Sequence, residues 1–179
     1  MDNLLVELLK YAKLDRIEPI VTRIEMSDVI ESICLMLKNE IEKTQATISY
    51  DLMPKIYTKQ IFINQLFQNL IHNAIKFHRK DVACKIHIGC SEQENHYLFS
   101  VADNGIGIPE EYQEEIFHIF SQLEAENYEG TGIGLAICKK IVDKLKGKIW
   151  LNSEVNKGTT FNIIIPKPKQ AYITINRGT

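Results

Sequence analysis

Two glycine-rich turns and one polar helix face constrain this chain more than any other feature of its sequence. The turns span residues 103–107 and 130–134, and the helix-like run 69–77 carries two amides and an ammonium on one face. Glycine lets backbone N–H groups approach a ligand closely, and amide oxygens suit a hard cation such as Mg²⁺. The three segments together predict a site for a metal ion and a nucleotide.

The length and composition allow one domain with a single core. The chain has 179 residues, 45% of them hydrophobic, and a net charge of −2 without a long basic run, which argues against a nucleic-acid surface. No Cys-x-x-Cys pair occurs, so the four cysteines are expected to be free thiols in a reducing cytoplasm. No apolar stretch approaches the ~20 residues of a membrane span and no signal peptide opens the chain. We therefore expect a cytoplasmic segment without membrane contact, whose parent protein could still be membrane-anchored.

Hydrophobic periodicity predicts a mixture of helices and short strands. The helices are expected at 2–14, 28–42, 59–77 and 133–146, and the strands at 20–26, 47–50, 55–58, 85–91, 96–102, 148–153 and 159–165. Ser27 is expected to cap the second helix, and Ile61 to lie on or near the buried side of the third. Residues 103–130 are expected to form a loop with one helical turn at 114–120. This order predicts a two-layer α/β sandwich, with three main helices on one face of a mixed sheet.

The polar helix face has a spacing that suits a metal site. Asn69 and Asn73 are four residues apart, and Asn73 and Lys76 are three apart, so all three project from neighbouring turns. Asparagine is a poor helix former, so two of them inside a long helix need a reason. Amide oxygens could bind Mg²⁺ and Lys76 could reach phosphate oxygens. A solvated polar face remains the alternative for this helix taken alone.

The first glycine turn follows a predicted strand. Asn104 and Gly105 form a dipeptide that is typical of hairpin turns. Gly107 and Pro109 then stand where a returning strand should alternate, which argues against a hairpin. A carboxylate at the end of a strand, here Asp103, can instead accept a hydrogen bond from an exocyclic amine such as that of adenine.

The second glycine turn opens a predicted helix, where backbone N–H groups and the helix dipole favour a phosphate. It is not a dinucleotide-binding fingerprint, because Leu135 stands where that motif requires glycine and residues 124–129 are no buried strand. The chain contains no Walker motif.

The ordered motifs N-L-I-H-N-A-I-K-F, D-N-G-I-G-I, I-F-H-I-F, G-T-G-I-G-L and G-T-T-F resemble a known family. They are similar to those of the catalytic ATP-binding domain of bacterial sensor histidine kinases, within the wider superfamily of gyrase, heat-shock chaperones, histidine kinases and mismatch-repair ATPases. The resemblance covers residues 20–166 and implies ATP and Mg²⁺ as cofactors. It makes residues 1–19 the end of a dimerisation and phosphoacceptor helix, and residues 167–179 a tail.

The resemblance also implies roles for individual residues. Asn73 would be the Mg²⁺ ligand with Asn69 near it, Lys76 would contact phosphate, and Asp103 would bind the adenine amine; the first three would be the catalytic residues. The nucleotide-binding residues it implies are Asn69, Asn73, Lys76, Phe77, Asp103, Gly105, Gly107, Ile108, Phe120, Gly130, Thr131, Gly132, Ile133, Gly134, Leu135 and Thr159. Phe117 and Phe120 would anchor a lid hinged at the second glycine turn. Plain core packing is the alternative for both phenylalanines.

Residue 69 distinguishes between members of the superfamily. The gyrase and mismatch-repair ATPases resemble one another in placing a glutamate there, as the general base for water. Asn69 cannot accept a proton at neutral pH, so we expect phosphoryl transfer to a protein acceptor rather than rapid hydrolysis. A gyrase-like conformational ATPase is therefore the less favoured interpretation.

The chain lacks the motif that receives the phosphoryl group. Histidine kinases carry it in a His-Glu-x-x-x-Pro-like box, and none of the five histidines (His72, His78, His87, His96 and His118) lies in one. We expect a fragment that binds Mg·ATP and does not autophosphorylate alone. Its partners would be the phosphoacceptor and dimerisation domain of the same kinase and a downstream response regulator, and the parent would be a homodimer.

The lid departs from the family pattern. Family lids often carry a basic residue shortly after the second phenylalanine, whereas residues 121–129 hold Glu124, Glu126 and Glu129 and no lysine or arginine. Acidic side chains near a triphosphate should weaken its binding. An alternative function therefore stays open, namely a nucleotide-sensing or scaffolding module with little catalysis.

Overall fold

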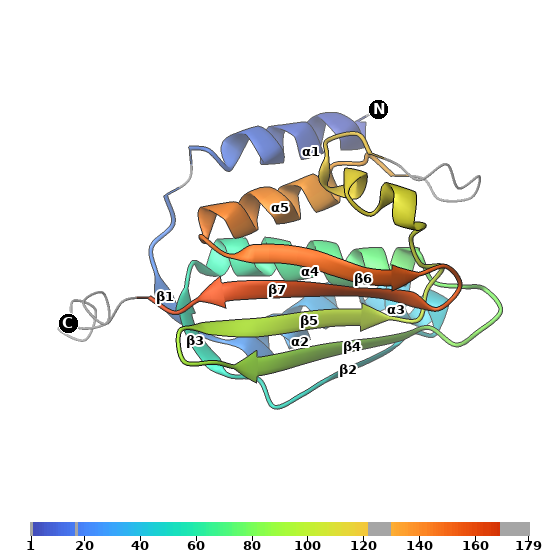
Figure 1. Ribbon diagram of the computed structural model, residues 1–179, viewed down its shortest axis with the longest axis horizontal. Helices are drawn as coiled ribbons and strands as arrows, with labels where there is room; N and C mark the ends of the chain where they lie inside the picture. Colours follow the sequence, from blue (N-terminus) through green and yellow to red (C-terminus); the bar gives the residue numbers. More distant parts are fainter. Residues whose placement is uncertain (1, 17, 122–129, 169–179) are drawn as a thin grey trace.

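A mixed sheet forms one layer of the protein. The computed structural model describes residues 2–16, 18–121 and 130–168. Five strands lie in the order β2-β4-β5-β7-β6, shown in Figure 1. Their bounds are β2 Thr47–Tyr50, β4 Lys85–Glu92, β5 His96–Asp103, β6 Lys148–Glu154 and β7 Gly158–Pro166. β2 runs parallel to β4, and the other neighbours are antiparallel.

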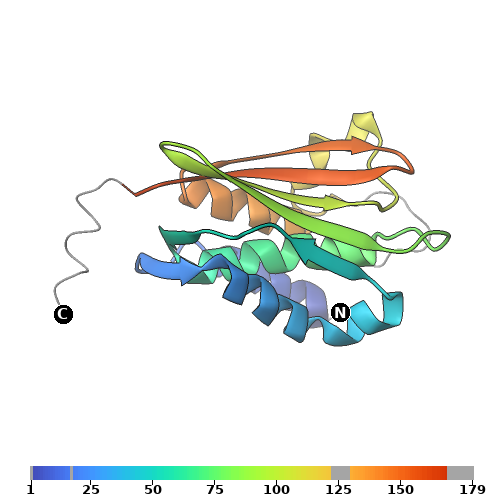
Figure 2. The ribbon, with the colours of Figure 1, turned by 90° about the horizontal axis from the view of Figure 1, so that it is seen from below.

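Helices form the second layer. They are α1 Asp2–Lys13, α2 Met26–Met36, α3 Lys38–Thr44, α4 Gln60–Lys76 and α5 Gly134–Lys144. Figure 2 shows α2, α4 and α5 on one face of the sheet, which confirms the predicted two-layer α/β sandwich. A separate two-stranded ribbon pairs β1 (Thr22–Glu25) with β3 (Lys55–Thr58). Among the described residues, no helix has the length and apolar composition needed to cross a bilayer.

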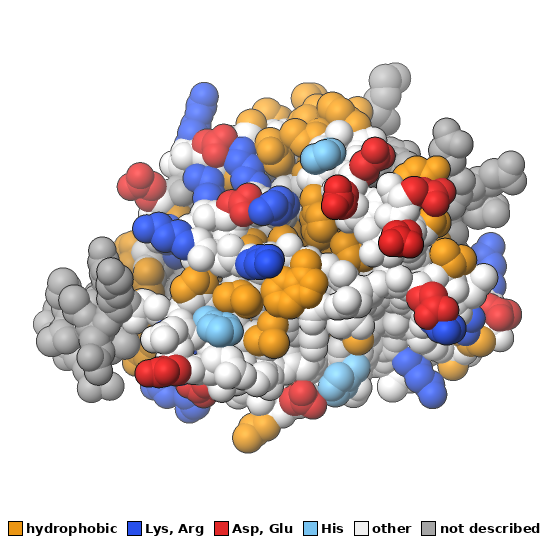
Figure 3. Space-filling model, in the orientation of Figure 1, with side chains coloured by type: hydrophobic (Ala, Val, Ile, Leu, Met, Phe, Trp, Pro, Cys, Tyr) orange, Lys and Arg blue, Asp and Glu red, His pale blue; other side chains and the backbone are white. Residues whose placement is uncertain are grey.

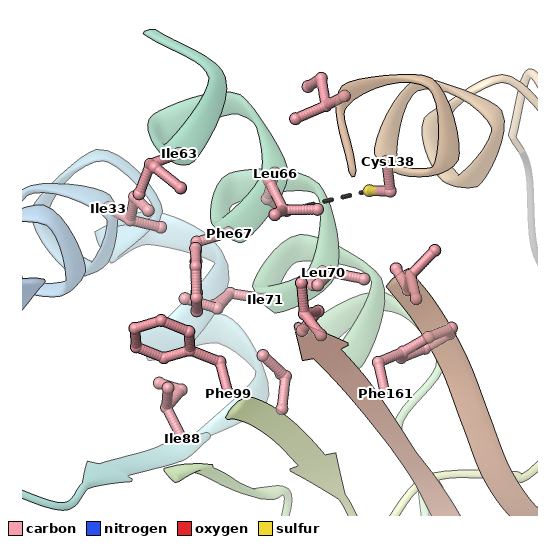
Figure 4. Packing of buried hydrophobic residues seen from close by; sticks show 14 of the residues in the cluster. Ile33, Ile63, Leu66, Phe67, Leu70, Ile71, Ile88, Phe99, Cys138 and Phe161 are labelled. Carbon is pink, nitrogen blue, oxygen red and sulfur yellow. Dashed lines mark hydrogen bonds between the residues drawn. The ribbon is translucent and has the colours of Figure 1, made fainter. Parts of the chain in front are cut away.

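The core lies between α4 and the sheet. α4 buries a stripe with helical spacing, and the rings of Phe67 and Phe99 meet edge to face with centroids 5.4 Å apart (Figure 4). α5 packs against α4 in the same core, where the Cys138 thiol donates to the Leu66 carbonyl oxygen (3.9 Å). Burial raises the pKa of Cys138 to about 12, so its thiol stays protonated and serves the packing.

Two details of the second predicted helix were wrong. Residues 28–42 form parts of two helices, α2 and α3, which are separated at Leu37 (φ −94°, ψ 16°). Ser27 does not cap α2, because the helix begins one residue earlier at Met26, whose side chain is fully buried. β1 thus leads directly into α2, without an intervening loop.

The predictions for other elements were right in type and inexact in detail. Ile61 is 51% exposed, because the buried stripe of α4 starts one residue later, at Phe62. The single helical turn expected at 114–120 is instead a pair of short 3₁₀ helices, η1 (Glu110–Tyr112) and η2 (Glu115–Phe117). The predicted strands all exist, two of them (47–50 and 55–58) with the predicted bounds and the others with bounds shifted by one or two residues.

α1 lies beside α5 (Figure 1). The Lys140 ammonium on α5 donates to the Tyr11 carbonyl oxygen (3.1 Å) and to the Asp15 carboxylate (2.7 Å), and lies 4.0 Å from the centre of the Tyr11 ring. Leu5 and Leu9 remain 62% and 49% exposed. Hydrophobic side chains gather at the edge of the molecule where α1 lies, as Figure 3 shows.

Candidate functional site

A pocket of about 220 Å³ opens between the C-terminal half of α4, the two glycine turns and β7. It collects segments that are far apart in the sequence. Of the residues that the sequence singled out, it is lined by Asn69, Asn73, Lys76, Phe77, Asp103, Gly107, Ile108, Gly130, Thr131, Gly132, Gly134, Leu135 and Thr159. Gly105, Phe120 and Ile133 do not line it. The side chain of Ile133 is fully buried in the core, so any contact with a ligand would fall to its backbone.

One end of the pocket is built around the carboxylate of Asp103. Its Oδ1 accepts hydrogen bonds from the backbone N–H groups of Gly105 (2.8 Å) and Thr159 (3.2 Å). No described residue donates to Oδ2, so that oxygen is available as an acceptor at the pocket. Burial raises the pKa of Asp103, and the two backbone bonds oppose part of that rise.

The raised pKa of Asp103 predicts a pH-dependent stability. The folded chain holds its proton to higher pH than the unfolded chain, so this group makes folding less favourable as pH rises from 3.8 through the raised pKa. In the Asp103→Asn variant that loss is absent. Urea unfolding should show the free energy of unfolding of the variant rising relative to that of the wild type as the pH increases above 3.8. A stability difference that does not change with pH would contradict the assignment.

The first glycine turn packs too closely for any larger residue. A Cβ on Gly105 would lie 2.5 Å from the Phe77 carbonyl oxygen, and one on Gly107 would lie 2.1 Å from the Glu154 carbonyl oxygen. Gly107 also has a φ of +71°, which favours glycine. The turn is thus clamped between the end of α4 and the β6–β7 hairpin.

The Asn-Gly dipeptide forms no hairpin turn, as expected from Gly107 and Pro109. The Asn104 side chain donates to the Ala83 carbonyl oxygen (2.8 Å) and accepts from the Lys85 backbone N–H (2.8 Å). No strand returns from the turn, because β5 pairs with β4 and β7. Asn104 instead fixes the end of β5 and, with it, the position of the neighbouring carboxylate.

The two asparagines of α4 lie in different surroundings. The Asn69 amide donates to the Gly134 carbonyl oxygen (3.0 Å), and its oxygen accepts from Gln65 (3.0 Å). Asn69 therefore joins α4 to the first turn of α5. The side-chain amide of Asn73 makes no hydrogen bond to any residue that the structure describes, so its oxygen is available to a ligand in the pocket.

A positive charge lies beside the second glycine turn. A Cβ on Gly130 would come within 2.4 Å of the Lys76 ammonium nitrogen, which also lies 4.5 Å from the centre of the Phe77 ring. In the described parts of the chain, no cluster of three His, Cys, Asp or Glu side chains could hold a metal ion. A cation here would need ligand oxygens in addition to amide oxygens, as Mg²⁺ does when it binds with a phosphate substrate.

The two phenylalanines have different roles. Phe117 packs edge to face against Phe161, with ring centroids 6.3 Å apart, so core packing holds for it. Phe120 is 58% exposed and has a φ of 69°, and its backbone N–H donates to the Gly132 carbonyl oxygen (3.0 Å). The acidic side chains predicted for the lid, Glu124, Glu126 and Glu129, lie outside the described residues.

The sequence did not indicate that Glu7 would line this pocket. Glu7 belongs to α1, and its carboxylate accepts a hydrogen bond from the Thr131 hydroxyl. No local pattern could reveal this, because the contact depends on how α1 lies against α5. His72, Ile106, Ile116 and Phe161 also line the pocket. Phe161 could have been suggested by the alternation of buried and exposed positions along β7.

A fixed acceptor, an open amide, an ammonium and close-packed glycine turns surround one pocket, an arrangement that suits a nucleotide. The chain belongs to the family described as "Histidine kinase-, DNA gyrase B-, and HSP90-like ATPase", which matches residues 58–169. The predicted resemblance to histidine kinase catalytic domains is confirmed, since the catalytic domain of histidine kinase ThkA is among the similar solved structures.

Three proteins illustrate the similarity. Cyanobacterial phytochrome A from Nostoc sp. (strain PCC 7120) is 41% identical over 93% of this chain, which spans 22% of that relative's length. The catalytic domain of histidine kinase ThkA is 30% identical, with a TM-score of 0.70 over 82% of this chain and 97% of that one. A complex of ThkA with the response regulator TrrA has a TM-score of 0.71 at 27% identity over 93% of this chain and 47% of that one. Full-length ShkA with AMPPNP has a TM-score of 0.81 over 95% of this chain and 36% of that one, and at 22% identity it supports the fold alone.

Proposed function

We propose that this chain binds Mg·ATP and donates the γ-phosphoryl group to a histidine on the phosphoacceptor and dimerisation domain of a two-component sensor kinase. The observation that carries the proposal is the arrangement of the pocket. It has a half-buried acceptor at one end, and the open amide of Asn73 with the Lys76 ammonium near the other. The amide at Asn69 is engaged in joining two helices. A nucleotide base fits the first end and a charged phosphate chain fits the second.

The residues present fit the proposed cofactors. Asp103 would accept from the adenine amine through Oδ2, and Lys76 would contact phosphate oxygens. Asn73 would give an amide oxygen to Mg²⁺, with Asn69 holding the adjacent turn of α5 in place. The magnesium ion would reduce the charge repulsion between phosphate oxygens. Transfer would release ADP and form a phosphorus–nitrogen bond on the acceptor histidine.

The proposed partners follow from the family. ThkA forms a complex with a response regulator, and we propose one as the downstream partner of this chain too. Residues 1–19 would be the end of a dimerisation helix in a homodimeric, cytoplasmic or membrane-anchored parent. The exposed Leu5 and Leu9 of α1 suit a helix that packs against others.

A nucleotide-binding measurement tests this proposal. Isothermal titration should show ATP binding that is several-fold tighter with Mg²⁺ than with a chelator present. Adenosine should bind measurably but more weakly, because the base end is built by the protein alone. Absence of binding in both conditions would overturn the proposed function.

Glu7 gives a further prediction for the phosphate end. Its carboxylate lies beside the second glycine turn, where it would repel a triphosphate. Glu7→Gln should therefore tighten ATP binding roughly threefold to tenfold, which corresponds to about 1 kcal/mol. Adenosine affinity, measured in parallel, should not change, because adenosine carries no phosphate.

The Glu7→Gln variant also distinguishes phosphoryl transfer from ATP hydrolysis as the function of the site. Among the described residues, Glu7 and Asp103 are the carboxylates that line the pocket. A gyrase-like ATPase would need such a group as its general base. If Glu7→Gln abolished a substantial steady-state ATP hydrolysis by the wild type, the conformational-ATPase alternative would gain at the expense of phosphoryl transfer.

A further inference from the structure

A pair of hydroxyl groups lies behind the base end of the pocket. Thr159 of β7 lines the pocket and is 6% exposed, whereas Ser153 of β6 does not line it. The two strands pair in a register that places these residues opposite each other. Their hydroxyl oxygens are 2.8 Å apart, so one of them donates to the other.

The other partners of Ser153 decide the direction of that bond. Its oxygen lies 2.8 Å from the Ile108 backbone nitrogen, which can only donate, and 3.0 Å from the Gly158 carbonyl oxygen, which can only accept. A serine hydroxyl has one hydrogen and two lone pairs. The hydrogen therefore goes to Gly158, and one lone pair accepts from Ile108. The second lone pair accepts from the Thr159 hydroxyl, which satisfies every group.

This assignment fixes what Thr159 can offer a ligand. Its single hydroxyl hydrogen points back to Ser153, so only lone pairs remain on the side of the pocket. Its backbone N–H is also engaged, because it donates to Oδ1 of Asp103. Thr159 and Oδ2 of Asp103 are thus two acceptors at the same end of the pocket, and two acceptors favour a base that presents an amine.

The loop next to Ser153 holds this arrangement in place. The Gln113 side-chain amide lies 3.0 Å from the Ile108 carbonyl oxygen and 3.2 Å from the Ser153 carbonyl oxygen. Gln113 thereby ties the segment after Gly107 to β6. Two of the three partners of the Ser153 hydroxyl, the Ile108 N–H and the Gly158 carbonyl, are backbone groups of fixed position, so the hydroxyl has little freedom to reverse its bonds.

We propose that Ser153 is a positioning residue that makes the site selective for 6-aminopurine nucleotides over 6-oxopurine nucleotides, by keeping the Thr159 hydroxyl an acceptor. The proposal rests on the proposed ATP-binding function and deepens it. Ser153 acts through its neighbour and does not touch the base. A 6-oxo group would face two acceptors and be rejected, since a site with unpaired polar groups discriminates strongly.

The test compares ATP with inosine triphosphate, whose base carries an oxygen in place of the amine. Ser153→Ala frees the Thr159 hydroxyl to donate, so the ATP-over-ITP affinity ratio should fall roughly fivefold to tenfold. Ser153→Thr keeps a hydroxyl and should restore the ratio. A merely structural role would weaken both nucleotides equally and leave the ratio unchanged, and that result would overturn the proposal.

A double-mutant cycle makes the test independent of the folding of one variant. Thr159→Val should lower the ratio by itself, and Ser153→Ala should then change it less than twofold further, because its effect passes through Thr159. Thr160→Val on the same strand is the matched control and should leave the ratio unchanged. Independent effects of the two substitutions would overturn the proposal. Failure of the wild type to bind ATP would instead overturn the proposed function itself.

Discussion

Replacing Asp103 by asparagine is expected to weaken ATP binding at least 100-fold while the unliganded protein stays folded. The Asn oxygen can still accept from the Gly105 and Thr159 backbone N–H groups, so the turn is kept. The amide NH₂ then replaces Oδ2 and faces the adenine amine, donor against donor. Loss of a charged hydrogen bond and this mismatch together amount to about 3 kcal/mol. Isothermal titration measures the affinity, and circular dichroism checks the fold.

The control for Asp103→Asn removes a carboxylate elsewhere. Asp143→Asn on α5 breaks an exposed ion pair with Lys139 and should leave ATP affinity unchanged. Affinity of Asp103→Asn within threefold of the wild type would mean that the carboxylate is not the base acceptor. The orientation proposed for the nucleotide would then be wrong.

Replacing Asn73 by alanine is expected to remove the magnesium-dependent part of ATP affinity. Its amide has no partner in the described part of the protein, so its loss should not unfold α4. We expect ATP to bind roughly 10- to 100-fold more weakly with Mg²⁺ present and almost unchanged with a chelator. Titrations of ATP in both conditions measure the difference.

Two other asparagines on the same helix are matched controls for Asn73→Ala. Asn64 is exposed away from the pocket, so Asn64→Ala should change nothing. Asn69 joins α4 to Gly134, so Asn69→Ala should lower the free energy of unfolding by about 1 kcal/mol. If Asn73→Ala weakened binding equally with and without Mg²⁺, its role would be packing rather than metal binding.

Much of the fold could be predicted because its main signals are local. The α4 stripe and the alternation along β4, β5 and β7 are set by one helix or strand facing one core. Glycines at Gly105 and Gly107 were informative because backbone contacts there leave no room for a side chain. Where the backbone leaves no room for a Cβ, the sequence must have glycine, so such positions can be recognised from the sequence.

The rest depended on contacts between distant segments. Glu7 reaches the pocket only because α1 lies against α5. Asn69 and Asn73 have the same side chain on the same helix. Only the approach of Gly134 shows that Asn69 joins two helices, whereas the Asn73 amide is left available to a ligand. Ser153 has no motif at all, since its role comes from the register of β6 and β7. The break of the second helix at Leu37 has no signal in the sequence either, because neither glycine nor proline stands there.

The central claim is phosphoryl transfer, and one labelling experiment tests it most directly. The chain is incubated with Mg²⁺ and ATP labelled in the γ-phosphoryl group, together with a phosphoacceptor domain from the same parent kinase. We predict acid-labile phosphohistidine on the added domain, none on this chain alone, and none with Asn73→Ala. Tight ATP binding with no label on the acceptor would contradict the account and favour a nucleotide-sensing module.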